Sequence, residues 1–322
     1  MKTFFWLVKR EYWENRGGFL WAPIITGGIF LLLNIMGIIA AEVIGARHGV
    51  LANGNLNSLV AHANAGDMAD VGNALDVALL SSMWLISIVM GFVVLFYCLG
   101  SLYDDRRDRS ILFWKSLPIS NISTVLSKVV SATVVAPVIA VIAGIVFGML
   151  QLLIFTLVLS FHGINAWQLL LLAHPVRAVL SSLCSIPLYA LFALPAVGWL
   201  MFCSAWARSK PFLWAVATPA LTGLMLSWFG IMDLFNLSTS WFWSHVVLRV
   251  LISVFPGSNL ALDDHNMTTY ISISSRGQSP LSLIDPAQTY SELSSPNLWI
   301  GVIAGIALLA VVTWLRRTSD DS

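Results

Sequence analysis

The sequence predicts an all-α polytopic membrane protein with six transmembrane helices. Hydrophobic residues make up 58% of the 322-residue chain and charged residues only 10%, whereas a soluble domain carries about 25% charged residues. The apolar residues form long continuous runs, unlike the short alternating segments of a membrane β-barrel. This composition excludes a soluble enzyme and a disordered chain. The net charge of +1 provides no basic field that would attract nucleic acid.

Six uncharged runs approach or exceed the roughly 20 residues that a helix needs to cross the hydrocarbon core. They are residues 19–41, 77–100, 129–161, 178–207, 211–232 and 298–315. The third run is long enough to tilt or to extend past the membrane. The first is about twice as long as the 7–15-residue apolar core of a signal peptide, so we expect it to be retained as a span. Residues 19–322 are therefore predicted to form one six-helix domain.

Residues 1–18 precede the first span and are predicted to form a helix along the cytoplasmic membrane surface. Aromatic side chains alternate there with charged ones, and aromatic rings with cationic partners suit the headgroup layer. Gly17 and Gly18 are predicted to end this helix. The alternative interpretation is a basic flank that only sets the topology. The aromatic residues are Phe4, Phe5, Trp6, Tyr12 and Trp13.

The distribution of Lys and Arg predicts that both ends of the chain are cytoplasmic. With the N-terminus inside, 13 of the 17 Lys and Arg residues fall in internal segments, which is the bias that the positive-inside rule describes. The internal segments are residues 1–18, 101–128, 208–210 and 316–322. The external cations are Arg47, Arg177, Arg249 and Arg276.

Three segments are predicted to lie outside, namely residues 42–76, 162–177 and 233–297. The last of them is the longest and has two parts. Residues 241–255 are apolar but contain His245 and Arg249, one helical turn apart on a shared face. This stretch is too short and too charged to span, so we expect an interfacial or re-entrant helix. After Pro256 and Gly257 the chain becomes polar.

The search for catalytic motifs predicts no catalytic, cofactor-binding or metal-binding residue. None of the five lysines follows a glycine, so the phosphate-binding motif G-x-x-x-x-G-K-[ST] is absent. The six histidines include no H-E-x-x-H, and no G-x-S-x-G elbow occurs. The predicted spans contain essentially no ionisable residue, which argues against ion-coupled transport.

The internal segment between the second and third spans has an unusual charge pattern. It reads SLYDDRRDRSILFWKSLPISNISTVLSK, residues 101–128, with six consecutive charged residues at 104–109 followed by an apolar stretch. Helical spacing would allow ion pairs between Asp105 and Arg109 and between Asp104 and Arg107. Pro118 is expected to break or restart the helix, and Ser120 or Asn121 can cap the helix that begins after it.

A charged surface helix beside an apolar anchor has the form of a docking element for a soluble partner. The alternative is an ordinary loop that obeys the positive-inside rule. The run D-R-x-D-x-S-I-L-F-W-K-S-L-P-I-S, followed by T-V-L-S-K, resembles the cytoplasmic segment between spans two and three of ABC-2 type transporter permeases. Outside residues 101–128 the chain agrees with that family in architecture only.

The resemblance implies a permease subunit of the bacterial inner membrane that has no ATPase of its own. Two such permeases, identical or different, assemble in the lipid bilayer with two cytoplasmic ABC ATPase subunits, which bind the ATP and Mg. Nucleic acid is not an expected partner. The resemblance also implies an ATPase-coupling interface in this segment. Its expected residues are Asp104, Asp105, Arg106, Arg107, Asp108, Arg109, Trp114 and Lys115.

The expected function is therefore ATP-driven export, with a path between two permeases lined by the less bulky faces of spans two and five. Spans without ionisable residues suit an amphipathic, lipid-like or peptide cargo. Two alternatives remain open. One is a non-transporting subunit that couples an ATPase to an external partner through residues 233–297. The other is a membrane-embedded enzyme, for which the candidate residues are Ser181, Ser182, Ser185, His162 and His174.

Overall fold

The computed structural model describes residues 2–47, 65–108, 120–161, 173–231, 239–258, 281 and 286–318. These residues form helices and no β-strand. Six helices among them are long and apolar enough to cross a membrane, which confirms the predicted all-α class and the number of candidate spans. They are Gly17–Gly45, Val71–Arg107, Asn121–Phe161, Pro175–Trp206, Pro211–Phe229 and Pro296–Thr318.

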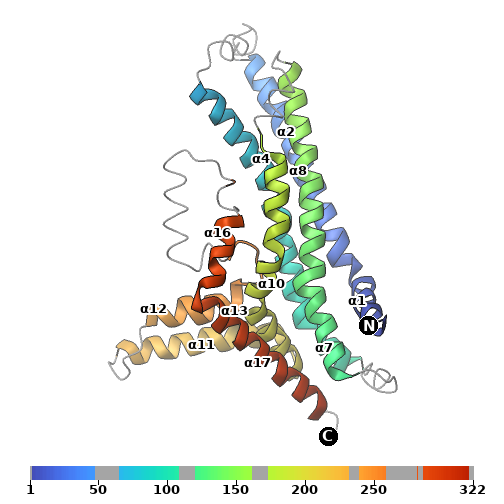
Figure 1. Ribbon diagram of the computed structural model, residues 1–322, viewed down its shortest axis with the longest axis vertical. Helices are drawn as coiled ribbons and strands as arrows, with labels where there is room; N and C mark the ends of the chain where they lie inside the picture. Colours follow the sequence, from blue (N-terminus) through green and yellow to red (C-terminus); the bar gives the residue numbers. More distant parts are fainter. Residues whose placement is uncertain are drawn as a thin grey trace.

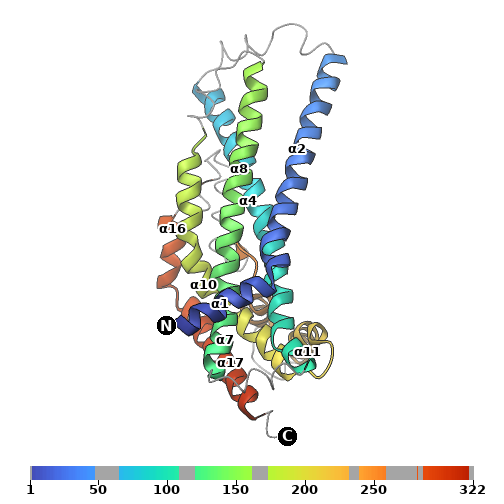
Figure 2. The same ribbon diagram turned by 90° about the vertical axis from the view of Figure 1, so that its right-hand side faces the viewer.

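The centre of the molecule is an elongated bundle, shown in Figures 1 and 2. Its helices are α2 (Ala22–Arg47), α4 (Ala65–Ser101), α8 (Ala136–Phe161) and α10 (Pro175–Trp206). Helix α4 packs against each of the other three. Its buried residues Ile86, Met90, Val94 and Cys98 recur every fourth position, so they form one helical face directed into the core. Few residues of the candidate span that contains α2 are buried, as expected of a helix at the edge of the bundle that faces lipid.

Helix α4 extends further than its uncharged run predicted. It begins at Ala65, so residues 65–76, the last third of the predicted external segment 42–76, are helical. Asp76 thereby lies inside the helix and is 1% exposed. One oxygen of Asp76 accepts a hydrogen bond from the His174 backbone N–H at 3.0 Å, and the other lies 3.3 Å from His174 Nδ1. Asp76 was predicted to lie in the external segment, but the second candidate span begins at Val71 and includes it. The contacts with His174 satisfy the buried carboxylate.

The third candidate span is one continuous helix from Asn121 to Phe161. It consists of α7 (Asn121–Val130), a π-helical turn η2 (Ser131–Val135) and α8. It begins before the predicted residue 129. Ser120 has extended backbone geometry and its hydroxyl accepts from the Ser123 backbone N–H at 3.2 Å, which confirms the predicted N-terminal cap.

The fifth candidate span takes a different direction from the bundle. Helix α11 (Pro211–Ile231) and the helical segment formed by α12 (Thr239–Phe242), η3 (Trp243–Leu248) and α13 (Arg249–Ile252) lie side by side across the long axis (Figure 1). Trp243 Nε1 donates to Ser227 Oγ at 3.0 Å and joins them. The six apolar helices therefore do not share one common axis.

The helix predicted within residues 241–255 is confirmed, but His245 and Arg249 have separate partners. The His245 ring stacks on Trp241, with centroids 5.3 Å apart. The Arg249 guanidinium donates to the carbonyls of Asn297 and Leu298, at the start of α17 (Pro296–Thr318). This contact attaches the segment to the last candidate span.

Helices α10 and α17 approach closely through two glycines. A Cβ at Gly305 would lie 2.7 Å from the carbonyl carbon of Leu194, and one at Gly198 would lie 2.8 Å from the Gly305 carbonyl oxygen. Small residues allow this kind of backbone approach between membrane helices. Because the obstructing atoms belong to the backbone, a larger side chain has no rotamer that avoids them.

We expect Gly305→Leu to destabilise the protein by about 1–3 kcal/mol, the range for overpacking a filled site. The matched control is Gly28→Leu on α2, where a Cβ would meet no atom within 4 Å. Thermal unfolding of both variants in the same detergent measures the difference. Equal unfolding midpoints for the two variants would contradict the close α10–α17 crossing.

Candidate functional site

The N-terminal helix α1 (Lys2–Glu14) lies across the bundle near α7 and α17, as Figure 2 shows. Its outer face exposes Phe5, Trp6 and Trp13. Lys9 Nζ lies 4.7 Å from the centre of the Trp6 ring, a cation–π contact suited to the headgroup layer. The helical conformation predicted for residues 1–18 is confirmed for Lys2–Glu14, and its location at the membrane surface stays a prediction. The helix ends at Glu14, before the predicted Gly17, and a π-helical turn η1 (Gly17–Trp21) leads into α2.

The inner face of α1 carries a buried carboxylate. Leu7 and Glu11 are four residues apart and both are buried, with Glu11 only 1% exposed. Glu11 Oε2 accepts from the Tyr97 hydroxyl at 2.9 Å, and Arg10 Nη2 lies 2.7 Å from Glu11 Oε1. Arg10 also pairs with the half-exposed Glu14 at 3.2 Å. Partial burial raises the pKa of the Glu14 carboxyl above its ordinary value, and the Arg10 guanidinium opposes this shift.

Lys128 connects this carboxylate to the segment after α4. Its ammonium lies 3.3 Å from Glu11 Oε1 and 3.4 Å from Asp105 Oδ2, and its side chain is only 4% exposed. A buried charge is tolerated only when it is paired and hydrogen-bonded. We refer to Glu11, Tyr97, Asp105 and Lys128 as the ion cluster. This cluster holds together α1, α4, α7 and the short helix α5 (Tyr103–Arg107).

A second set of contacts joins α5 to the end of α10. Arg106 Nη2 donates to the carbonyl oxygens of Ser204 and Ala207, the latter at 2.9 Å. The Ser204 hydroxyl accepts from the backbone N–H groups of Leu102 and Tyr103 at 3.2 and 3.0 Å. A guanidinium at a helix C-terminus pairs with otherwise unsatisfied carbonyls and with the negative end of the helix dipole. The position of α5 is therefore fixed relative to α10.

The structure divides the eight predicted interface residues into three groups. Asp105 and Arg106 point inward and bind other helices of this chain. The three exposed residues are Asp104, Arg107 and Asp108. The three that lie outside the described residues are Arg109, Trp114 and Lys115. Asp105 has Lys128 beside it, and its predicted pairing with Arg109 involves a residue outside the described part of the chain. Within the described part of this segment, the charges that face outward are therefore those of Asp104, Arg107 and Asp108.

Three of the five residues considered for catalysis, Ser182, Ser185 and His174, contact other groups of this chain. The hydroxyls of Ser182 and Ser185 donate to the carbonyls of Ala178 and Ser182, both at 2.8 Å. Ser181 is buried, and His174 contacts Asp76. His162 lies outside the described residues.

Comparisons of the sequence and structure with protein families, curated proteins and solved structures found no match. The function therefore has to be argued from the site and from the pattern of the sequence.

Proposed function

We propose that this chain is the membrane subunit of an ABC-2 type ATP-driven transporter and that a separate ABC ATPase docks on α5. The observation that carries the proposal is the two-sided character of α5. One side exposes the mixed charges of Asp104, Arg107 and Asp108. The other is attached to the bundle through Asp105 and Arg106. A coupling element needs both an accessible surface and a firm connection to the spans.

The contacts of α5 suggest how movement of the ATPase would reach the membrane helices. A displacement of α5 would act on α10 through the Arg106–Ala207 contact and on the α7–α8 helix through Asp105 and Lys128. Because Glu11 shares Lys128, α1 would respond as well. ATP binding to the partner would shift the population between two arrangements by favouring one of them.

The proposed complex contains two permease copies, identical or different, and two ATPase subunits that supply ATP and Mg. The proposed activity is export of an amphipathic, lipid-like or peptide cargo across a bacterial inner membrane. Most of the described span residues are apolar. The buried charged residues among those described are Asp76 and, in the ion cluster, Glu11 and Lys128. This distribution suits a cargo that is itself largely apolar.

The proposal requires α5 to be cytoplasmic, which reporter fusions can test. We expect a reporter placed after Arg317 to be active only inside the cell and one inserted at Ser274 only outside. The physical reason is the excess of Lys and Arg in the segments assigned to the inside. Activity on the opposite side at either position would remove α5 from the reach of a cytoplasmic ATPase.

A further inference from the structure

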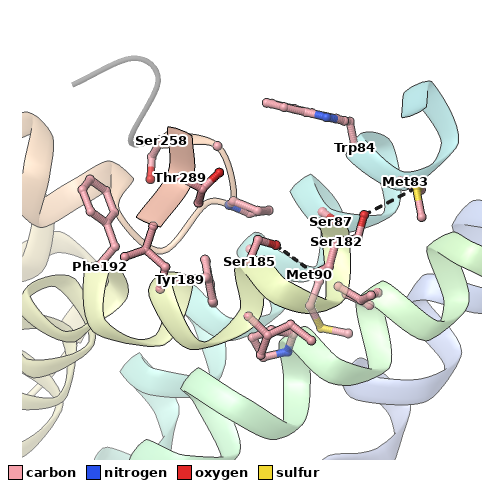
Figure 3. Close-up of a pocket in the computed structure, with 18 of the residues that line it drawn as sticks. Met83, Trp84, Ser87, Met90, Ser182, Ser185, Tyr189, Phe192, Ser258 and Thr289 are labelled. Carbon is pink, nitrogen blue, oxygen red and sulfur yellow. Dashed lines mark hydrogen bonds between the residues drawn. The ribbon is translucent and has the colours of Figure 1, made fainter. Parts of the chain in front are cut away.

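A pocket of about 150 Å³ lies between α4, α8 and α10. The turn at Pro256, Gly257 and Ser258 borders it together with Thr289 of α16 (Pro286–Ser291), and Figure 3 shows this arrangement. Engineered apolar cavities of about this volume hold a molecule the size of benzene. The residues that line the pocket all belong to a single chain, so the pocket does not require a second permease.

The described residues that form the walls of the pocket are mostly apolar and carry no charge. Trp84, Tyr189 and Phe192 contribute the largest side chains, with Met83 and Met90 beside them. An ionised ligand group would lose its hydration there without gaining a counter-charge. Methionine side chains adapt to irregular shapes. The lining therefore favours a neutral, compact apolar group.

The hydroxyl groups on α10 restrict the ligand further. Ser182, Ser185 and Tyr189 follow one another on the face of α10 that lines the pocket (Figure 3). Each hydroxyl donates its proton to a carbonyl: Ser182 to Ala178, Ser185 to Ser182 and Tyr189 to Val254. Each oxygen keeps lone pairs that can accept a hydrogen bond. The α10 face of the pocket thus presents acceptors, and a ligand that binds to this face has to bring the donor.

The border of the pocket is held in a fixed position. Gly257 has a φ of +79°, and a Cβ there would collide with the Trp84 ring. Glycine alone fits this close approach without strain. The Tyr189 hydroxyl also binds the carbonyl of Val254, just before this turn. The acceptors of α10 and the turn that borders the pocket are therefore organised together.

We infer that the pocket binds a small neutral alcohol, with its apolar ring or short chain among Met83, Met90 and Phe192. Its hydroxyl donates to Ser182 or Ser185. The inference goes beyond the proposed function and does not depend on a partner ATPase, so it can be tested on the isolated chain.

The test uses 4-fluorobenzyl alcohol as the probe, followed by fluorine NMR, with the full chain in lipid nanodiscs so that no detergent fills the pocket. We expect saturable binding above the partitioning into empty nanodiscs. Ser185→Phe, which fills the pocket, should abolish it. Leu183→Phe, at an exposed position of the same helix, should leave it unchanged.

Two further comparisons test the hydrogen bond itself. The double variant Ser182→Ala with Ser185→Ala removes acceptors without adding bulk, and we expect about fivefold weaker binding, the effect of roughly one hydrogen bond. The methyl ether of the probe has no hydrogen-bond donor, so we expect the native chain to bind it more weakly than the alcohol by a similar factor. The inference would be overturned if saturable binding is absent, if Ser185→Phe binds like the native chain, or if ether and alcohol bind equally well.

Discussion

Lys128→Met is expected to destabilise the folded protein by about 3–5 kcal/mol, the range for removing one partner of a buried ion pair. The substitution leaves the carboxylate of Glu11, which is 1% exposed, without the ammonium that now lies 3.3 Å from it. Asp105 loses the same ammonium. Methionine preserves the length of the side chain, so the loss reflects charge more than packing.

The matched control is Lys9→Met on the exposed outer face of α1. It removes the same charge from the same end of the bundle, so any effect of total charge on insertion is equal. Thermal unfolding in detergent compares the two variants. Glu11→Gln added to Lys128→Met should recover part of the lost stability, because neighbours in one network are not additive. Equal unfolding of Lys128→Met and Lys9→Met would refute a structural role for the ion cluster.

Arg106 and Arg107 are neighbours, yet charge reversal at each is expected to impair a different property of the protein. Arg107→Glu should leave the protein stable and inserted but lower recovery of the partner ATPase by at least about tenfold. Like charges opposed across a docking surface can cost several kcal/mol, and tenfold requires about 1.4 kcal/mol. Arg106→Glu should instead lower stability, because it places a carboxylate beside the carbonyls of Ser204 and Ala207.

Both substitutions change the charge by the same amount within one internal segment, so each serves as the control for the other. Membrane abundance, the unfolding midpoint and the amount of co-purified ATPase are measured for both, with the reporter fusions confirming unchanged topology. Native ATPase recovery by Arg107→Glu would remove this residue from the docking surface. Native stability of Arg106→Glu would show that its contacts to α10 are dispensable.

The sequence predicts the features of this fold that depend on local composition. Apolar runs locate six helices, and Ser120 marks the start of one because capping depends on a side chain and its next few residues. The start of α4 could not be predicted from uncharged runs, since Asp76 is satisfied by a residue distant in sequence. The direction of α11 could not be predicted from the sequence either, because hydropathy specifies the length of a span and not its tilt.

The candidate site shows the same division. The run of charged residues at 104–109 predicts a docking segment, but which of these charges point outward depends on packing between helices that are distant in the sequence. Glu11 and Lys128 are 117 positions apart, and no spacing rule joins them. One local sign was present: Glu11 follows Leu7 at helical spacing, which places it on the same side of α1. The pocket likewise could not be predicted, because it forms only where Ser182 and Ser185 of α10 meet Met83 and Met90 of α4.

The most direct measurement of the proposed function is affinity purification of the tagged chain from its native membrane in mild detergent. Mass spectrometry then identifies the proteins that co-elute. We predict an ABC ATPase with a phosphate-binding loop, in a ratio of about one to one with the chain, and ATP hydrolysis by the complex but not by the chain alone. Recovery of the chain without any such ATPase, or ATP hydrolysis by the pure chain, would contradict its assignment as a permease subunit.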